Sequence, residues 1–371
     1  MQLMTKDGEA VGSEIQDSPP IKVGVIGGGY GISTLLPAIS SISEFSLTSV
    51  ARSRHSNHIY NRSNFENGNI ALVSAAEIIE SPSVELVVIA TPPSDHEKYA
   101  IEALENGKSI FCEKPGGLNV EATRKISKAI SASGGHATIG YQFRYDPLIK
   151  WLSRIVAEGS LGRMQRVDVL WETSGATKTP VTSWRNNLEL GGGVLRDFAS
   201  HIFDYMRIID PLNFGAYSEV KRNYTNHNIK RNPSPINFQE IDFTTQFGSA
   251  EFHCKVSRNV TVPLGHKITI QGEHGVAEAI HKFPFGIVDM SAQYWLKSNM
   301  KKEDRTNELG LAAIAENLAK YRLNVRQLAA RNLFTEFSKI LLGGNALNLP
   351  NFDQGISNQL YVEEVEKILF S

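Results

Sequence analysis

The chain has 371 residues, of which 41% are hydrophobic and 21% charged, and its formal net charge is −1. This length exceeds what a single ordinary core holds, so we expect two domains. The near-neutral charge argues against nucleic acid as a partner, which would need a basic surface, and no apolar run approaches the roughly 20 residues that span a bilayer.

The first twenty residues are polar, contain glycine and proline, and lack a basic stretch followed by an apolar one. We therefore expect a disordered tail over residues 1–20 and no secretory signal. The only two cysteines, Cys112 and Cys254, each lie in an apolar, strand-like setting. They predict buried free thiols in a reducing compartment such as the cytoplasm. Because no histidine cluster accompanies them, we expect no metal site.

Residues 21–141 alternate between short β-branched runs and helical patterns. The runs are nearly continuous in apolar residues, as expected for strands covered on both faces. The predicted strands are Ile21–Ile26, Leu47–Ala51, Val84–Ala90, Ser109–Glu113 and Ala137–Tyr141. The alternation predicts a Rossmann-type first domain over 21–141, with a parallel, doubly wound sheet.

The helical patterns of this region carry recognisable end signals. Ser74 with Glu77 fits a capping box, and Asn119 is a suitable N-cap for a helix that runs to Ser131. A further helix over Asp95–Asn106 is closed by a glycine at the C-terminal cap. Helices are therefore expected between successive strands.

The stretch IGGGYG at residues 26–31 lies between the first strand and the next helix. Glycines here allow a tight turn and let backbone N–H groups approach a pyrophosphate at the helix N-terminus. Gly27 and Gly29 occupy the first two positions of the dinucleotide fingerprint, whereas Ile32 stands at the third position. Gly31, next to Tyr30, comes one residue early. The stretch predicts a dinucleotide site, and an ordinary loop is the alternative.

The second strand is followed by Arg52, Ser53 and Arg54. A chain that binds NAD usually has an acidic residue here, which holds the ribose 2′-hydroxyl. Because a guanidinium pairs with a phosphate through two hydrogen bonds, the arginines predict NADP rather than NAD as the cofactor. A solvated loop is the alternative interpretation.

Two more stretches follow the strands that end at Ala90 and Glu113. They are Thr91-Pro92, with His96 shortly after, and Glu113-Lys114-Pro115. Ligands of an open parallel sheet lie beyond the carboxyl ends of its strands, so both stretches are predicted to line the cofactor crevice. A charged lysine there favours the alkoxide of a substrate hydroxyl. We expect His96 to cap a helix start and shape the cofactor loop.

From about residue 163 the strands become longer, and few helices separate the later ones. An antiparallel sheet is therefore expected in a second domain over 142–371. A helical region, Arg305–Leu341, and a terminal helix, Gln354–Phe370, follow the strands. The predicted strands are Arg163–Glu172, Ala216–Arg222, Ile241–Phe247, Ala250–Ser257, Lys267–Gln271 and Val276–His281.

In the second domain, three glycines at residues 191–193 precede Asp197 and His201. Residues four apart share one face of a helix. A histidine with a carboxylate neighbour is a proton acceptor that can be tuned near neutral pH. The pair therefore predicts acid–base chemistry, and a surface pair is the alternative.

Four other residues are candidates for substrate contact. Trp184 and Arg185 are expected to face the cleft, with an aromatic lid on the sheet as an equal alternative. Tyr141 and Gln142 end a strand at the domain junction, where they are placed to touch nicotinamide or substrate or simply to pack.

In this combination and order, the motifs resemble those of the glucose–fructose oxidoreductase / inositol dehydrogenase / rhizopine-catabolism oxidoreductase family. The resemblance runs from about Ile21 to the C-terminus. It is carried by Gly27–Gly31, Thr91-Pro92 with His96, Glu113-Lys114-Pro115, the stretch Gln142–Pro147, Trp184-Arg185, the triple glycine, and Asp197 with His201.

The resemblance implies a Rossmann domain and an α/β domain with a large open sheet that supports homodimers or homotetramers. It implies hydride transfer between nicotinamide C4 and a carbon of a small-molecule substrate: a sugar, an inositol or a nucleotide-linked sugar. Lys114 would orient the substrate, His201 would take or return the hydroxyl proton, and Asp197 would position both substrate and histidine. A reductase of another carbonyl or imine compound and a non-catalytic NADP-binding regulator are the alternatives.

The sequence departs from the family pattern at two further positions. Ala199 replaces the glycine usual between the aspartate and the histidine, which adds only a methyl group. The acidic residue after the second strand is missing, which moves the expected preference toward NADP.

Overall fold

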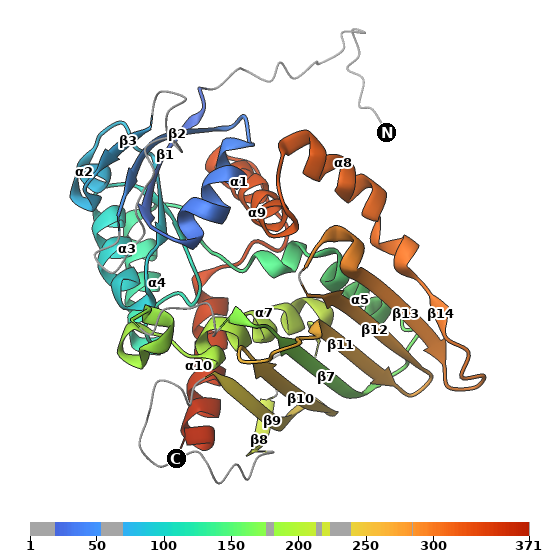
Figure 1. Ribbon diagram of the computed structural model, residues 1–371. Coiled ribbons are helices and arrows are strands. Elements are labelled where there is room, and N and C mark those ends of the chain that lie inside the picture. Colours follow the sequence, from blue (N-terminus) through green and yellow to red (C-terminus); the bar gives the residue numbers. More distant parts are fainter. Residues whose placement is uncertain are drawn as a thin grey trace, which may run out of the picture.

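The computed structural model describes residues 19–52, 70–175, 182–212, 217–222, 239–283 and 285–370. Almost all of the tail predicted over 1–20 lies outside the described residues, as do Ser53 and Arg54. The described chain forms two β-sheets, one in each half of the sequence, with helices packed around both (Figure 1).

The N-terminal sheet has six strands in the order β3-β2-β1-β4-β5-β6, and all of its pairings are parallel. This order reverses direction between β1 and β4, which is where such sheets bind ligands. The predicted parallel sheet is confirmed, and the three-residue β3 was not predicted. The strands are β1 (Ile21–Gly27), β2 (Phe45–Ala51), β3 (Ala71–Val73), β4 (Leu86–Ala90), β5 (Ser109–Cys112) and β6 (Ala137–Ile139).

The predicted end signals of the helices act as expected. Ser74 Oγ accepts from the Glu77 backbone N–H at 3.2 Å, and Glu77 Oε2 accepts from the Ser74 N–H at 2.8 Å. Asn119 Oδ1 accepts from the backbone N–H of Ala122 at 2.9 Å. The helices of this half are α1 (Leu36–Ser40), α2 (Ala75–Glu80), α3 (His96–Glu105) and α4 (Val120–Ser133), with the π-helical turn η1 (Gly31–Leu35) before α1 and the 3-10 turn η3 (Pro93–Asp95) before α3.

The helix α9 (Val325–Leu341) belongs to the C-terminal part of the chain but packs on the N-terminal sheet (Figure 1). Phe334 stacks on Phe111 of β5 with ring centroids 4.3 Å apart, and it meets the edge of Phe45 at 6.0 Å. All three rings belong to one buried cluster with strand residues of that sheet. The boundary predicted between residues 141 and 142 remains a prediction, and this packing shows that sequence order alone does not assign α9.

Replacing Phe334 with leucine is expected to lower the free energy of unfolding by about 1–2 kcal/mol, because buried ring area and the stacked pair are both lost. Urea unfolding measures this. Leu347→Ala is the control, since Leu347 is 84% exposed. Equal stability of the two variants would contradict the packing of α9 on the sheet.

The second sheet has eight strands in the order β14-β13-β12-β11-β7-β10-β9-β8. Its described pairings are antiparallel except that of β7 with β10, so the predicted mostly antiparallel sheet is confirmed. Buried and partly exposed residues alternate along β9 and β10, as in a sheet with one packed face. The strands are β7 (Met164–Glu172), β8 (Tyr217–Arg222), β9 (Glu240–Phe247), β10 (Ala250–Ser257), β11 (Gly265–Gly272), β12 (Gly275–Lys282), β13 (Met290–Leu296) and β14 (Glu303–Asp304), of which β13 and β14 were not predicted.

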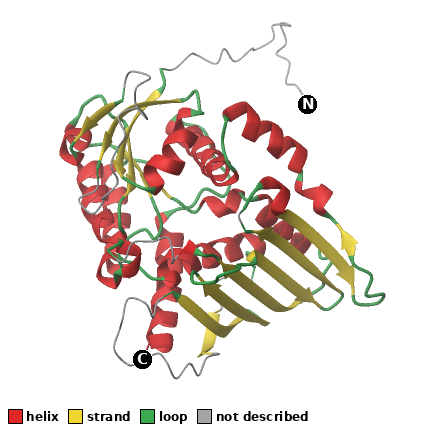
Figure 2. Cartoon of the chain, in the orientation of Figure 1, coloured by secondary structure: helices red, strands yellow, loops and turns green. Residues whose placement is uncertain are grey.

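Helices cover one face of this sheet, and in the described chain the opposite face carries none (Figure 2). The helical region expected over Arg305–Leu341 is present. It contains two helices, and Arg322 between them has a left-handed φ of 53°. The helices are α5 (Pro147–Ala157), α7 (Ser200–Ile209), α8 (Leu311–Tyr321) and α10 (Phe352–Phe370), with short turns η4 (Gln142–Tyr145), η5 (Trp184–Asn186), η6 (Leu188–Leu190), η7 (Leu195–Ala199), η9 (Ile287–Asp289) and η10 (Thr306–Leu309).

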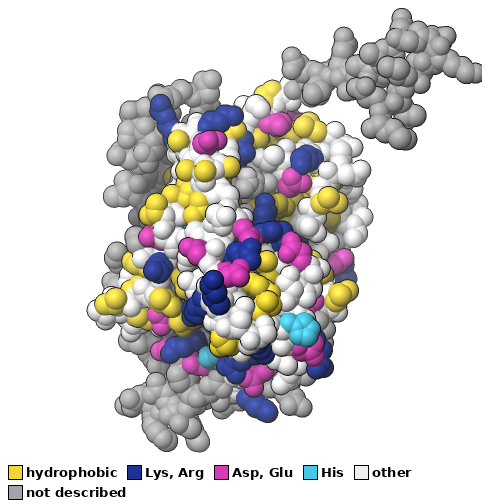
Figure 3. All heavy atoms as spheres, turned by 90° about the vertical axis from the view of Figure 1, so that its right-hand side faces the viewer, with side chains coloured by type: hydrophobic (Ala, Val, Ile, Leu, Met, Phe, Trp, Pro, Cys, Tyr) yellow, Lys and Arg dark blue, Asp and Glu magenta, His cyan; other side chains and the backbone are white. Residues whose placement is uncertain are grey.

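The surface agrees with the near-neutral net charge. Basic and acidic side chains are interspersed on the face shown in Figure 3. Among the helices that the structure describes, none is both long and apolar enough to cross a bilayer.

Candidate active site

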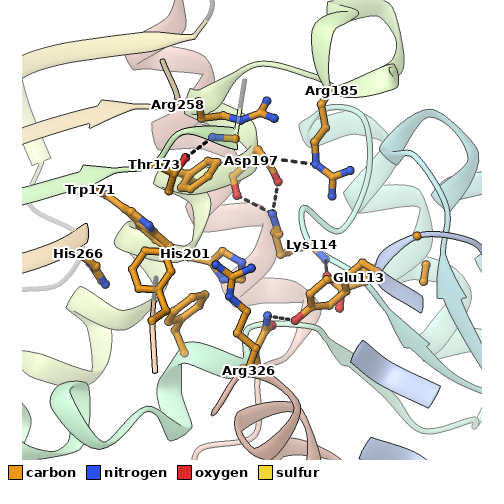
Figure 4. Close-up of a pocket in the computed structure, with 18 of the residues that line it drawn as sticks. Glu113, Lys114, Trp171, Thr173, Arg185, Asp197, His201, Arg258, His266 and Arg326 are labelled. Carbon is orange, nitrogen blue, oxygen red and sulfur yellow. Dashed lines mark hydrogen bonds and ion pairs between the residues drawn. The ribbon is translucent and has the colours of Figure 1, made fainter. Parts of the chain in front are cut away.

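A cavity of about 700 Å³ lies beside the carboxyl ends of β1, β4 and β5. Residues from both halves of the chain form its walls (Figure 4). The ends of β1, β4 and β5 contribute Gly28, Gly29, Tyr30, Thr91, Pro92, Glu113 and Lys114, and the chain from residue 142 onward, called here the second half, contributes Gln142, Trp184, Arg185, Asp197 and His201. Most of the predicted site residues therefore converge on one space.

The glycine loop is shaped by its close approach to β4. Gly27 has a φ of 149°, and a Cβ there would lie 2.3 Å from the carbonyl oxygen of Ala90. A Cβ on Gly31 would lie 3.0 Å from the Ala90 Cβ. The early third glycine thus lets the helix pack closely on the sheet, which is a role of glycine in this fingerprint. Gly27, Gly31 and Ile32 do not line the cavity, whereas Gly28, Gly29 and Tyr30 do.

The His96 side chain links the two loops that follow β4 and β5. Its ring is fully buried, with Nδ1 2.9 Å from the carbonyl oxygen of Pro115 and Nε2 3.0 Å from that of Thr91. Burial lowers the pKa of His96. His96 is the first residue of α3, and the N-cap of that helix is Asp95, so the expected capping of the helix start by His96 is wrong. The ring does not line the cavity and contacts the two loops that follow β4 and β5.

Lys114 and Asp197 form a buried ion pair between the two halves of the chain. Lys114 Nζ donates to Asp197 Oδ1 at 2.7 Å and to the Asp197 carbonyl oxygen at 2.5 Å. Arg185 Nε donates to the other carboxylate oxygen at 3.2 Å. Burial by itself raises the pKa of the Asp197 carboxyl, but the surrounding cations outweigh burial and hold that pKa well below its usual range. Asp197 is therefore a permanent anion.

His201 lines the same cavity and is only 4% exposed. Its ring packs against Phe143 at a centroid distance of 4.7 Å and against Tyr141 at 5.9 Å. Burial, and after it the charge of Lys114, holds the pKa of His201 well below its usual range. The imidazole is therefore neutral at pH 7 and able to accept a proton.

The sequence predicted that His201 and Asp197 share a helix face. The structure places Asp197 in the π-helical turn η7 and His201 in the following α7, and the Asp197 carboxylate accepts hydrogen bonds from Lys114 and Arg185. The negative charge of Asp197 raises the pKa of His201, but burial and the charge of Lys114 lower that pKa by more.

Polar atoms at the walls still lack a protein partner within the described chain. They include Thr91 Oγ1, Glu113 Oε1 and His201 Nδ1. Burial raises the pKa of the Glu113 carboxyl to about 7, so this group is close to half-protonated at neutral pH. Gln142 Nε2 donates to the Tyr30 hydroxyl at 2.6 Å and joins the glycine loop to the second half of the chain. These features fit a ligand with hydroxyl, amide and phosphate groups.

The remaining predicted residues lie as follows. Arg185 stacks over the Trp184 ring with its guanidinium carbon 4.5 Å from the centroid, and both residues line the cavity. Tyr141 is buried, contacts the His201 ring and does not line the cavity. Arg52 is exposed at the end of β2, and its neighbours Ser53 and Arg54 lie outside the described residues.

Several wall residues were missed by the sequence analysis. Phe143 and Asp146 lie in the stretch Gln142–Pro147 and could have been inferred from it. Arg258, just after β10, and Arg326, at the start of α9, are marked by no local motif and reach the cavity only through the fold. The other missed wall residues include Trp171, Thr173, His266, His281 and Phe285.

Two family models match the chain in succession. Residues 21–141 match the model described as an oxidoreductase family with an NAD-binding Rossmann fold. Residues 149–278 match the GFO/IDH/MocA C-terminal domain. The two matched segments contain Lys114 and the Asp197–His201 segment, respectively.

Individual relatives agree with these matches. An uncharacterised oxidoreductase of Synechocystis is 27% identical over 278 residues, covering 70% of this chain and 71% of that protein. The scyllo-inositol 2-dehydrogenase (NAD+) of Bacillus subtilis is 28% identical over 196 residues, about half of each chain at 52% and 53%. The crystal structure of aldose-aldose oxidoreductase from Caulobacter crescentus, complexed with glycerol, has the same fold, with a TM-score of 0.71 at 18% identity over 94% of this chain and 97% of that one. The chain belongs to the GFO/IDH/MocA family of oxidoreductases.

Proposed function

We propose that this oxidoreductase uses NADP to transfer hydride between the nicotinamide and a CH–OH or C=O group of a sugar, an inositol or a nucleotide-linked sugar. The observation that carries the proposal is the convergence of Lys114, Asp197 and His201 beside the glycine loop in one cavity (Figure 4). Two of the similar proteins named above support the proposal, because their names give scyllo-inositol and aldoses as substrates.

The dinucleotide would be held by the ends of β1, β4 and β5. Gly29 and Tyr30 are placed to receive its pyrophosphate, and Thr91 and Pro92 form the adjoining wall. When bound, the nicotinamide supplies the hydride acceptor or donor at C4. Glu113 Oε1, which has no partner in the described chain, is placed to accept from a hydroxyl or amide of the cofactor or substrate.

The protein would handle the proton. Neutral His201 takes the proton of the substrate hydroxyl during oxidation and returns it during reduction. The ammonium of Lys114 stabilises the developing alkoxide, since positive charge acts strongly in a site that excludes water. Asp197 holds the Lys114 ammonium in place through the 2.7 Å ion pair.

A screen of sugars, polyols and nucleotide-linked sugars with NADP, followed by the absorbance of NADPH, tests the proposed function. Turnover of at least one polyhydroxylated compound is expected. Tight dinucleotide binding with no turnover in either direction would favour a regulator, and turnover confined to other carbonyls or imines would favour the alternative reductase.

Arg52 is expected to set part of the cofactor preference. Changing Arg52 to aspartate should shift the kcat/KM ratio from NADP toward NAD by about 10–100-fold, because a charge-assisted phosphate contact is replaced by repulsion. The ratio is measured with both cofactors in the two proteins. Arg124→Asp, a change at another exposed position, is the control. An unchanged ratio would mean that another group reads the phosphate.

We further propose that the protein is cytoplasmic, because both cysteines are free and buried.

We also propose that the protein forms homodimers or homotetramers through the helix-free face of the second sheet (Figure 2). Sedimentation equilibrium measures the mass, and a monomer at micromolar concentration would contradict the assembly.

A further inference from the structure

The carboxylate of Asp197 is surrounded by more positive charge than it can neutralise. Lys114 and Arg185 bond to its two oxygens. Arg258 acts on it as a third cation. The Lys114 and Asp197 side chains are 11% and 10% exposed, and Arg258 as a whole is 4% exposed. Three cations thus face one permanent anion at the cavity wall.

Glu113 does not correct this imbalance at neutral pH. Its carboxyl titrates near pH 7, so it contributes at most a fraction of a negative charge below that pH. The group of five side chains formed by Glu113, Lys114, Arg185, Asp197 and Arg258, called here the charged cluster, therefore carries between one and two net positive charges near pH 7. All five side chains line the cavity, and net positive charge at a cavity wall favours the binding of an anion.

Arg258 contributes its positive charge from the second sheet, on the side of the cavity where we expect the substrate to bind. Arg258 follows β10, and Thr173 follows β7, its parallel neighbour; the Thr173 N–H donates to the Ser257 carbonyl oxygen at 2.9 Å. Figure 4 shows Arg258 above Asp197 and Arg185 to its right, with Lys114 and Glu113 below them. The glycine loop follows β1 of the N-terminal sheet and Arg258 follows β10 of the second sheet, so we expect the dinucleotide phosphates to bind away from Arg258.

Burial lowers the pKa of the Arg258 guanidinium, and the charge of Arg185 lowers it further against the effect of Asp197. Arg185 is more accessible, with a side chain 33% exposed, and is stacked on Trp184 at the cavity wall. The two guanidinium groups can together bind an anion through several directed N–H donors, which a lysine pair would not offer.

From this arrangement we infer that the substrate carries an anionic group, a carboxylate or a phosphate, which binds between Arg185 and Arg258 while its reacting carbon lies at Lys114 and His201. The inference rests on the proposed function, because it names the substrate class of that same site. It selects sugar acids or sugar phosphates over neutral sugars and polyols.

Calorimetric titration of the cofactor-saturated protein with three matched ligands, glucose, glucuronate and glucose 6-phosphate, tests the inference without requiring turnover. At least one of the two anionic ligands is expected to bind about 10–100-fold more tightly than glucose, because hydrogen bonds to charged groups contribute about 1.5–3 kcal/mol. The one that binds more tightly distinguishes a carboxylate from a phosphate. Equal affinity for all three ligands would overturn the inference.

Three variants test whether Arg185 and Arg258 cause the preference for anionic over neutral ligands. Arg258→Gln and Arg185→Gln should each reduce the ratio of anionic to neutral affinity by about tenfold or more, whereas Arg258→Lys, which keeps the charge, should retain part of it. Arg163→Gln is the matched control, since Arg163 pairs with Glu273 at the exposed surface. An unchanged ratio in Arg185→Gln and in folded Arg258→Gln would overturn the inference; Arg185→Gln alone decides if Arg258→Gln does not fold.

The outcomes separate this inference from the proposed function. Tight binding of an anionic sugar without hydride transfer to any compound would support the anion site and refute the enzyme mechanism. Rapid oxidation of neutral sugars, with no preference for anionic ones, would support the mechanism and refute the anion site.

Discussion

Lys114→Ala is expected to lower kcat by about 10²–10³-fold while leaving dinucleotide affinity within a few-fold of the wild-type value. The ammonium is the cation proposed to stabilise the alkoxide, and its 2.7 Å ion pair with Asp197 fixes it in the cavity. The backbone of the glycine loop, which is proposed to bind pyrophosphate, does not depend on this side chain. Steady-state kinetics and fluorescence titration with the dinucleotide measure the two quantities.

Lys125→Ala is the matched control, because Lys125 forms an exposed ion pair with Glu97 away from the cavity. Lys114→Arg should keep the ion pair but misplace the charge, and it should fall between the wild type and the alanine variant. A kcat for Lys114→Ala equal to that of the control would end the proposed role of Lys114.

His201→Ala is expected to lower kcat by about 10²–10⁴-fold, which is the usual contribution of a positioned general base. The residue is buried against Phe143 and Tyr141, so His201→Asn is needed as a variant that fills more of the same space. Both variants should retain the fold, as circular dichroism would show. His136→Ala, a change at an exposed histidine, is the control. Wild-type turnover in His201→Asn would refute the role of the imidazole.

The dependence of kcat/KM on pH provides a second test of His201 as the general base. Burial and the charge of Lys114 lower the pKa of His201, so the imidazole stays unprotonated and competent until the pH falls well below the ordinary value of about 6.5. The loss of kcat/KM attributable to His201 is therefore expected on the acid side of that value. Removing the cation in Lys114→Ala should raise the histidine pKa and move this loss to higher pH.

Glu113 would otherwise complicate this profile, since its pKa is about 7. Recording the profile in Glu113→Gln removes its titration and leaves that of His201. An acid limb that stays at the same pH in Lys114→Ala and Glu113→Gln/Lys114→Ala would contradict the electrostatic coupling between Lys114 and His201.

Local patterns in the sequence were sufficient for much of the fold. Apolar runs separated by helical patterns predicted β1, β2, β4, β5 and β6 of the N-terminal sheet, because a strand buried on both faces must be apolar along its length. The capping box at Ser74 and Glu77 could be predicted from the sequence because its hydrogen bonds join residues only three apart. Edge elements such as β3 and β14 were missed, because two or three partly exposed residues carry little periodic signal.

The candidate site was predictable where it follows strand ends. Gly29, Thr91 and Lys114 come directly after β1, β4 and β5, and parallel strands bring their carboxyl ends to one edge. The placement of Asp197 and His201 at the same cavity came from the resemblance to a family, because the second sheet is remote in sequence from the first. Cofactor preference and substrate class remain proposals.

By itself, the sequence determined the two kinds of sheet, the helix ends and the glycine loop, because each depends on residues that are neighbours in the chain. Only the tertiary structure decided that Lys114 pairs with Asp197, 83 residues away, that Arg258 adds a third cation, and that Phe334 of α9 joins the N-terminal core. The physical reason is that ion pairs and ring stacking act over a few ångströms in space. The residues they join are brought together by the burial of apolar surface throughout the chain, which no local spacing records.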